Sequence, residues 1–130
     1  MSTIFTKIIR GEIPAYKIAE DDNFIAFLDV FPLTKGHTLV IPKMEVDYIF
    51  GLDDEILSGL MVFAKKVALA LEKSVECKRI GVAVIGLEVP HAHIHLVPIH
   101  TVGDINFAQP KQKFKDEEMK AIAEKIKSNL

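Results

Sequence analysis

Three of the five histidines of the chain stand at every second position in the segment HAHIHLV, residues 91–97. Side chains alternate between the two faces of a β-strand, so a strand here would place His91, His93 and His95 on one face. The apolar residues between them would then point into the core. Near neutral pH an imidazole can act as a nucleophile, an acid, a base or a metal ligand. The spacing therefore favours a chemical role for this face of the sheet.

The residues alone leave three interpretations of this row open. Imidazoles at alternate strand positions lie about 6.5–7 Å apart, and two of them could converge on zinc, with a third joining where the strand bends. A neutral imidazole whose other ring nitrogen is held by an acceptor can instead attack phosphorus or a carbonyl. Its neighbours would then bind the oxygens of a transferring phosphoryl group. The third interpretation, a solvated strand face without chemistry, is the least favoured for three histidines in register.

Composition narrows the class of protein. A chain of 130 residues predicts one domain, 1–130, and 49% hydrophobic with 26% charged residues is ordinary for a soluble globular protein. The net charge of −2 shows no bulk attraction to nucleic acid or to an anionic membrane. A single cysteine, Cys77, excludes an intramolecular disulfide framework and fits a reducing compartment. With no long apolar run at the start or elsewhere, we expect a cytoplasmic protein.

Hydrophobic spacing predicts an α+β domain. We expect strands near 16–20, 24–29, 37–41, 80–85 and 92–99. We expect a short helix over 4–10, a helical turn near 48–52, a long helix from Asp53 or Asp54 to about Val75, and an amphipathic helix from Asp116. The arrangement is an antiparallel sheet of about five strands with the long helix inserted before the last two. The C-terminal helix would cover the sheet or meet a partner subunit.

Several ordered motifs resemble those of the histidine triad (HIT) family. The signature of that family is three histidines alternating with apolar residues, as in 91–97. Residues 4–14, 20–22, 26–30 and 36–43 follow the family's N-terminal motifs in order. The resemblance covers about residues 3–99 and is closest to the small Hint-like nucleotide hydrolases. Residues 101–130 form a C-terminal extension with its own helix.

The resemblance implies a fold, an activity and a set of catalytic residues. HIT proteins are homodimers that bind purine nucleotides and hydrolyse a bond to the α-phosphate, without a metal or other cofactor. His93 matches the nucleophile, which forms a nucleotidyl-histidine intermediate. His95 matches the residue that contacts the phosphate and the leaving group. His91 would support the orientation of the nucleophile, with His37 behind it.

The resemblance also assigns the nucleotide pocket. Asp29 matches the acidic residue that accepts hydrogen bonds from the ribose hydroxyls. The apolar residues that match the pocket around the base are Phe5, Ile8, Ile13, Phe27 and Val30. Without the resemblance, Phe5, Ile8, Ile13 and Phe27 would be interpreted as core, Asp29 as a turn residue and His37 as a strand-edge histidine.

Two segments depart from the family pattern. Thr3 and Thr6 occupy positions where many members carry zinc-binding cysteines, so we do not expect a structural zinc of that type. The segment before the first histidine is shortened and has Leu87 in the position of a glutamine. Gly86 keeps a possible close approach of backbone to phosphate.

Glu88, in the same segment, would repel a phosphate nearby or act on the leaving group instead. Two further functions therefore stay open beside the hydrolase. One is a nucleotide-binding module with little catalysis, and the other is a metal-binding protein that uses the histidine row.

Overall fold

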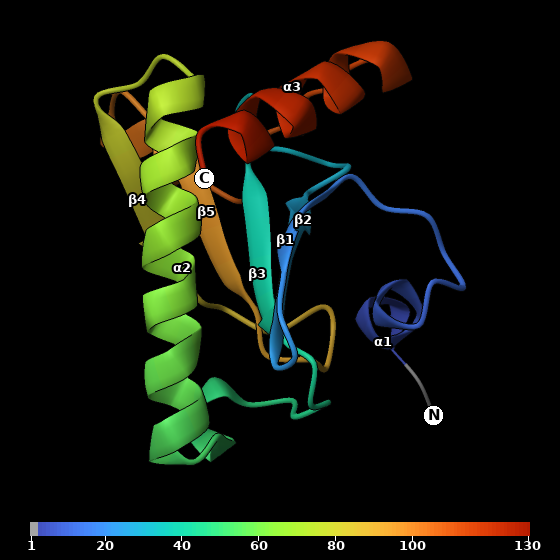
Figure 1. Ribbon diagram of the computed structural model, residues 1–130. Helices are drawn as coiled ribbons and strands as arrows, with labels where there is room; N and C mark the ends of the chain where they lie inside the picture. The colour runs from blue at the N-terminus through green and yellow to red at the C-terminus, as the bar shows by residue number, and fades with distance from the viewer. Residues whose placement is uncertain (1–2) are drawn as a thin grey trace.

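The computed structural model describes residues 3–130, which form an antiparallel five-stranded sheet with helices on both faces (Figure 1). The strands are β1 (Lys17–Glu20), β2 (Phe24–Leu28), β3 (Thr38–Pro42), β4 (Arg79–Ala83) and β5 (Ile94–Ile99), in the spatial order β1-β2-β3-β5-β4. The helices are α1 (Ile4–Ile9), α2 (Asp54–Ser74) and α3 (Asp116–Ser128), with two 3₁₀ turns, η1 (Ile49–Gly51) and η2 (Val102–Ile105). The predicted α+β arrangement of five strands, a long helix and a C-terminal helix is confirmed.

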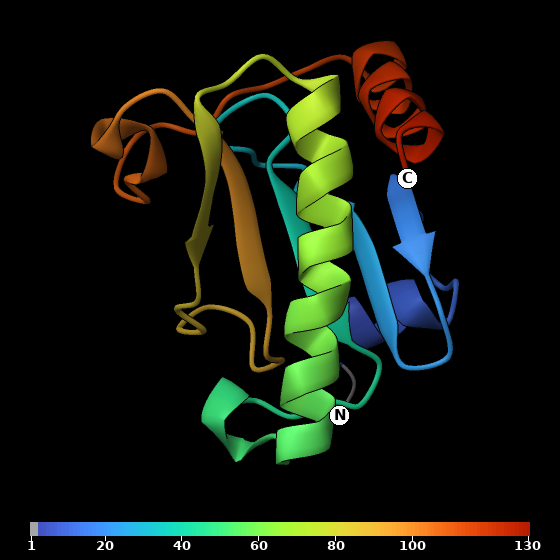
Figure 2. The ribbon, with the colours of Figure 1, turned by 60° about the vertical axis from the view of Figure 1, so that its left-hand side comes forward.

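The long helix α2 covers one face of the sheet, and α3 lies beside it (Figure 2). The side chain of Asp53 caps α2 by accepting a hydrogen bond from the Ile56 N–H at 2.8 Å. The apolar stripe of α2 packs on the even-numbered residues of β2, β3 and β5. Its members include Leu60, Ala64, Val67 and Leu71. Within residues 3–130, no helix is both long and apolar enough to cross a membrane.

The opposite face of the sheet carries a second, smaller apolar cluster. Its buried members are Phe5 from α1 and Ile25, Phe27, Leu39 and Ile41 from β2 and β3. These are the odd-numbered positions of the strands, as the alternation of strand side chains requires. The pairing places Phe27 beside Leu39, Leu39 beside His95, and His95 beside Ala83. His95 therefore lies within this face, on the side of the sheet away from α2.

The predicted histidine strand, 92–99, begins two residues too early, and the row of three histidines does not share one strand face. β5 begins at Ile94, so His91 and His93 precede it. The N–H of His91 donates to the Val89 carbonyl at 2.8 Å, and that of Ala92 donates to the Val46 carbonyl at 2.7 Å. Because these groups bond to loops, the backbone joins the sheet ladder only after His93. β4 likewise ends at Ala83, two residues before the predicted limit at residue 85.

Candidate active site

The turn before β5 fixes the ring of His93. Its Nδ1 lies 2.6 Å from the carbonyl oxygen of His91, and a carbonyl can only accept. The Nδ1 therefore carries the proton, and in the neutral ring the lone pair is on Nε2. A bare Nε2 with Nδ1–H held by an acceptor is the form of imidazole that attacks an electrophile.

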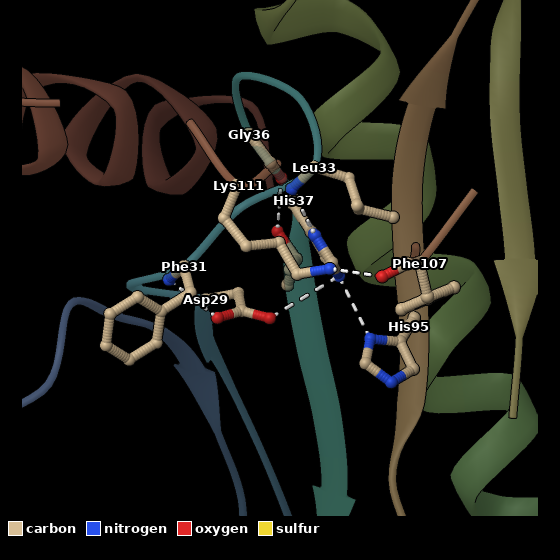
Figure 3. A network of polar contacts seen from close by, with 9 residues as sticks. Asp29, Phe31, Leu33, Gly36, His37, His95, Phe107 and Lys111 are labelled. Atoms are coloured by element: carbon tan, nitrogen blue, oxygen red, sulfur yellow. Dashed lines mark hydrogen bonds and ion pairs between the residues drawn. The ribbon is translucent and has the colours of Figure 1, made fainter. Parts of the chain in front are cut away.

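A second hydrogen-bonded relay sets the tautomer of His95 (Figure 3). The Leu33 N–H donates to Nδ1 of His37 at 3.0 Å, so that nitrogen holds a lone pair. Burial lowers the pKa of His37 to about 3, and the neutral ring carries its proton on Nε2. This Nε2–H donates to Nδ1 of His95 at 2.9 Å. Burial also lowers the pKa of His95 to about 4, so its proton is on Nε2 and can be donated to a ligand.

His37 lies behind His95, and not behind His91 as the sequence interpretation had it. The antiparallel pairing of β3 with β5 sets Thr38 against Leu96 and Leu39 against His95. His37, just before β3, is therefore brought to His95 and away from the turn that holds His91. The sequence cannot give this register, because the two strands are separated by all of α2 and β4.

The ring of His91 is anchored on its other side. Its Nε2–H donates to the Pro42 carbonyl at 2.8 Å, and its Nδ1 lies 3.2 Å from Oγ1 of Thr3. Burial lowers the pKa of His91, which keeps the ring neutral in these contacts. His91 thus orients His93 through its own carbonyl, and its ring holds that carbonyl in place.

A carboxylate not identified from the sequence completes this anchor. Glu45 accepts hydrogen bonds from the Thr3 N–H at 3.0 Å and from the Thr6 hydroxyl. The Thr3 hydroxyl in turn accepts from the Thr6 N–H and caps α1. The hydroxyl groups of Thr3 and Thr6 are not among the usual ligands of zinc. The N-terminal segment is therefore joined to His91 by a hydrogen-bonded network.

Asp29 directly follows β2, and its carboxylate contacts both the next turn and His37. Its Oδ1 accepts from the Phe31 N–H at 2.9 Å, and its Oδ2 lies 3.6 Å from Nε2 of His37. Burial raises the pKa of this carboxyl. Ligand atoms of Asp29, His37 and His95 lie within 4.8 Å of one another, the spacing of a possible metal site. However, a metal on Nε2 of His37 would move the ring proton to Nδ1, against the Leu33 N–H, so the donor set fits a proton relay better.

Of the five apolar residues predicted to surround the base, the structure places Phe5, Ile8 and Phe27 in one cluster. The ring of Phe5 makes edge contacts with Phe27 at 5.6 Å and with His93 at 5.0 Å between centroids. Ile8 packs against the same cluster. Ile13 is half-buried outside that cluster, and Val30 is 55% exposed. Phe5, Ile8 and Phe27 thus form an apolar wall beside His93.

The segment before the first histidine turns outward. Gly86 has φ +75°, a left-handed backbone that favours glycine, and a Cβ there would meet no atom of the chain within 4 Å. The Leu87 side chain is 89% exposed. Glu88 is exposed as well, and its charge adds to the raised pKa of Asp29. These three residues border the site without packing into it.

The C-terminal extension contributes two residues that sequence reasoning missed. The Phe107 ring stands edge-on to His95 at 4.7 Å and to His37 at 6.2 Å between centroids. Lys111 donates to the Phe107 carbonyl at 2.7 Å, and its Nζ is 5.5 Å from the centre of that ring. Both lie in an irregular segment whose residues show no period or motif, so only the folded chain reveals that they face the histidines.

An antiparallel α+β sheet with two oriented histidines at the start of β5 defines a histidine triad protein. The sequence matches the HIT domain over residues 10–102, and the chain belongs to the HIT family. It is 34% identical to the adenosine 5'-monophosphoramidase of Schizosaccharomyces pombe, a match that covers 100% of this chain and 99% of that protein.

Solved structures agree with this assignment. A Hit-like protein of Bartonella henselae, described as involved in cell-cycle regulation and crystallised with an unknown ligand, superposes with a TM-score of 0.85. It is 32% identical, with 99% of this chain and 97% of that chain covered. A zinc-bound histidine triad family protein of Mycobacterium smegmatis gives a TM-score of 0.84 at 27% identity, with 99% and 93% covered.

Proposed function

We propose that the protein is a nucleotide hydrolase that cleaves the bond between the α-phosphorus of a purine nucleoside phosphoramidate and its amine. The observation that carries this proposal is the 2.6 Å hydrogen bond from His93 Nδ1–H to the His91 carbonyl, which leaves Nε2 free. The monophosphoramidase identity of the fission yeast relative supports the same reaction class.

The reaction would proceed in two displacements. Nε2 of His93 attacks the α-phosphorus, an Nε2–P bond forms, and the P–N bond to the amine breaks as the amine takes up a proton from solvent. The ring, substituted on Nε2 and still protonated on Nδ1, becomes cationic, and the His91 carbonyl stabilises it. Water then attacks phosphorus and gives up a proton to solvent, the Nε2–P bond breaks, and the nucleoside monophosphate leaves with Nε2 restored.

His95 would assist both displacements from the neighbouring position. Its ring centroid is 4.9 Å from that of His93, and the relay from Leu33 through His37 leaves its Nε2–H as a donor. A donor there can hydrogen-bond a phosphoryl oxygen or the nitrogen of the departing amine. His37 acts through His95 as a positioning residue.

The nucleotide would lie along the same face of the sheet. We infer that Asp29 accepts hydrogen bonds from the ribose hydroxyls and that Phe5, Ile8 and Phe27 lie near the base. Ile13 and Val30 would border the base less closely, since they are outside the apolar cluster. Gly86 and Glu88 would approach the phosphate or the leaving group from the segment before His91. Purine nucleotides fit this combination of an apolar wall and a carboxylate.

A second candidate function is a nucleotide-binding module with little turnover. It is favoured by Leu87, which is exposed and, being a leucine, offers no side-chain amide to the phosphate. The side chains of His93 and His95 are also only 6% and 8% exposed, which restricts access for a substrate. Binding of AMP without phosphoramidate turnover would select this function.

We also propose that the chain forms a homodimer. Strand β4 is an edge of the sheet and carries the exposed residue Val82, and Val84 continues beyond it. The outer face of α2 exposes Val62 and Leu69. An open strand edge beside apolar side chains is the surface that a second copy would cover by extending the sheet.

The catalytic proposal is tested by combining turnover with mass spectrometry. Wild-type protein should release AMP from adenosine 5'-phosphoramidate, and a short reaction quenched early should show a nucleotidyl group on His93. His93→Ala should lose both signals. His100→Ala, which removes an exposed histidine after β5, is the matched control and should behave as the wild type. Turnover that survives in His93→Ala would end the proposal.

A further inference from the structure

An anionic substrate must be recognised in a site where Asp29 and Glu88 are acidic and where His37 and His95 carry no positive charge. Burial keeps His37 and His95 neutral because it lowers their pKa values to about 3 and about 4. Asp29 and Glu88 stand on the same side and would repel a phosphate when ionised. Phosphoryl oxygens need an opposite charge or several donors, so a cation is expected nearby.

Lys111 supplies that charge from the C-terminal extension. Its ammonium group interacts electrostatically with Asp29, His37 and His95, and contributes to the lowered pKa values of both histidines. Figure 3 shows the lysine side chain turned toward these three residues. Its partner for hydrogen bonding is the Phe107 carbonyl, and the Phe107 ring lies against His95. A flexible, exposed lysine with a main-chain partner can exchange that carbonyl for a stronger, charged acceptor.

We propose that Lys111 is a phosphate-binding residue that confers preference for nucleotides over neutral nucleosides. This rests on the proposed function and extends it to the C-terminal segment. On substrate entry, Nζ leaves the Phe107 carbonyl and binds a non-bridging oxygen of the α-phosphate. Phe107 remains the side wall that keeps Lys111 and His95 on the same phosphate. The extension thus supplies the donor that the segment around Leu87 lacks.

The alternative is that Lys111 only holds the loop. Its bond to Phe107 is exposed, and exposed hydrogen bonds and cation–π contacts contribute little to folding. A structural role would show as a shift of the unfolding temperature, with neutral and charged ligands affected alike. A phosphate-binding role would leave the unfolding temperature unchanged and affect the charged ligand alone.

The test compares Lys111→Gln, Lys111→Arg and the control Lys113→Gln, which removes the same charge from an exposed position two residues along the chain. AMP and adenosine are titrated into each protein by calorimetry, and KM and kcat are measured with adenosine 5'-phosphoramidate. Lys111→Gln should weaken AMP binding about tenfold or more, the effect of losing one charge-assisted hydrogen bond. Adenosine binding should stay the same, Lys111→Arg should recover most of the AMP affinity, and Lys113→Gln should match the wild type.

Three results would overturn the proposal. They are unchanged AMP affinity in Lys111→Gln, an equal loss for AMP and adenosine, and an equal loss in Lys113→Gln. Wild-type protein that binds AMP but does not release it from the phosphoramidate would refute the proposed catalysis only. In that case the comparison of AMP with adenosine still decides the role of Lys111.

Discussion

The two buried, neutral histidines predict that the fold loses stability when the pH falls below neutrality. In the unfolded chain a histidine has a pKa near 6.5, whereas the folded values are about 3 for His37 and about 4 for His95. Between these limits the unfolded state binds more protons than the folded state, so the free energy of unfolding decreases as the pH decreases. The stabilising contribution is complete above about pH 6.5 and is lost progressively below it.

The magnitude follows from the gap between the pH and the unfolded pKa. At about pH 5 protonation of each histidine lowers the free energy of the unfolded state by about 2 kcal/mol, and the folded state gains almost nothing. At this pH, His37 and His95 together therefore reduce the free energy of unfolding by about 4 kcal/mol, a large part of the stability of a small domain. The lowered pKa of His91 acts in the same direction. The raised pKa of Asp29 acts in the opposite direction, because the folded state holds that proton longer.

Urea unfolding followed by circular dichroism at several pH values measures this dependence. The urea midpoint should fall by about 2 M between neutral pH and about pH 5, with a slope m typical of a small domain. His37→Gln should lower stability at neutral pH and reduce the pH dependence by about half. His100→Asn removes an exposed histidine and should leave the pH dependence unchanged. A wild-type urea midpoint that does not change with pH would refute the assignment of neutral buried rings. So would the same pH dependence of the midpoint in His37→Gln and His100→Asn.

Two further predictions concern metal and assembly. Treating untagged protein with EDTA should change neither its unfolding temperature nor its turnover, because the His37 Nδ1 is engaged by the Leu33 N–H; elemental analysis that finds stoichiometric zinc would contradict this. Sedimentation equilibrium should give the mass of a dimer, and Val82→Lys should shift that mass toward the monomer. Glu117→Lys, at an exposed position on α3 away from β4, should not shift it. A wild-type monomer would end the dimer proposal.

Sequence periodicity was sufficient for the elements of the fold. The Asp53 cap and the apolar stripe of α2 predict the long helix to within a residue at each end, because capping and helical spacing are local properties. The continuous apolar run of residues 24–28 similarly marks β2, and the structure buries both of its faces. Strand ends were less predictable. The start of β5 depends on two main-chain hydrogen bonds, from His91 to Val89 in the preceding turn and from Ala92 to Val46 in a loop far away in the sequence.

Some residues of the candidate site are indicated by local sequence patterns, and others are brought there only by the fold. The alternating histidines and the family motifs point to residues 91–95, and the structure brings those rings together with Phe5. Glu45, Phe107 and Lys111 carry no such signal. Glu45 comes from the loop after β3, and Phe107 and Lys111 come from the irregular segment before α3. Ile13 and Val30 were included by position in the family pattern, but the fold leaves them outside the apolar wall.

The sequence by itself determined which residues can do chemistry: the identity and spacing of the histidines, and the absence of the N-terminal cysteines and of the usual glutamine. These are properties of single positions and of short local patterns. Tertiary structure alone decided which ring nitrogen carries the proton. That assignment depends on whether each nitrogen meets an N–H or a carbonyl: the Leu33 amide for His37, and the His91 carbonyl for His93. The Leu33 amide leaves the proton of His37 on Nε2, and because β3 pairs with β5 this proton is donated to His95, which is then a donor at its own Nε2. The His91 carbonyl holds the Nδ1 proton of His93 and leaves the lone pair of that ring on Nε2.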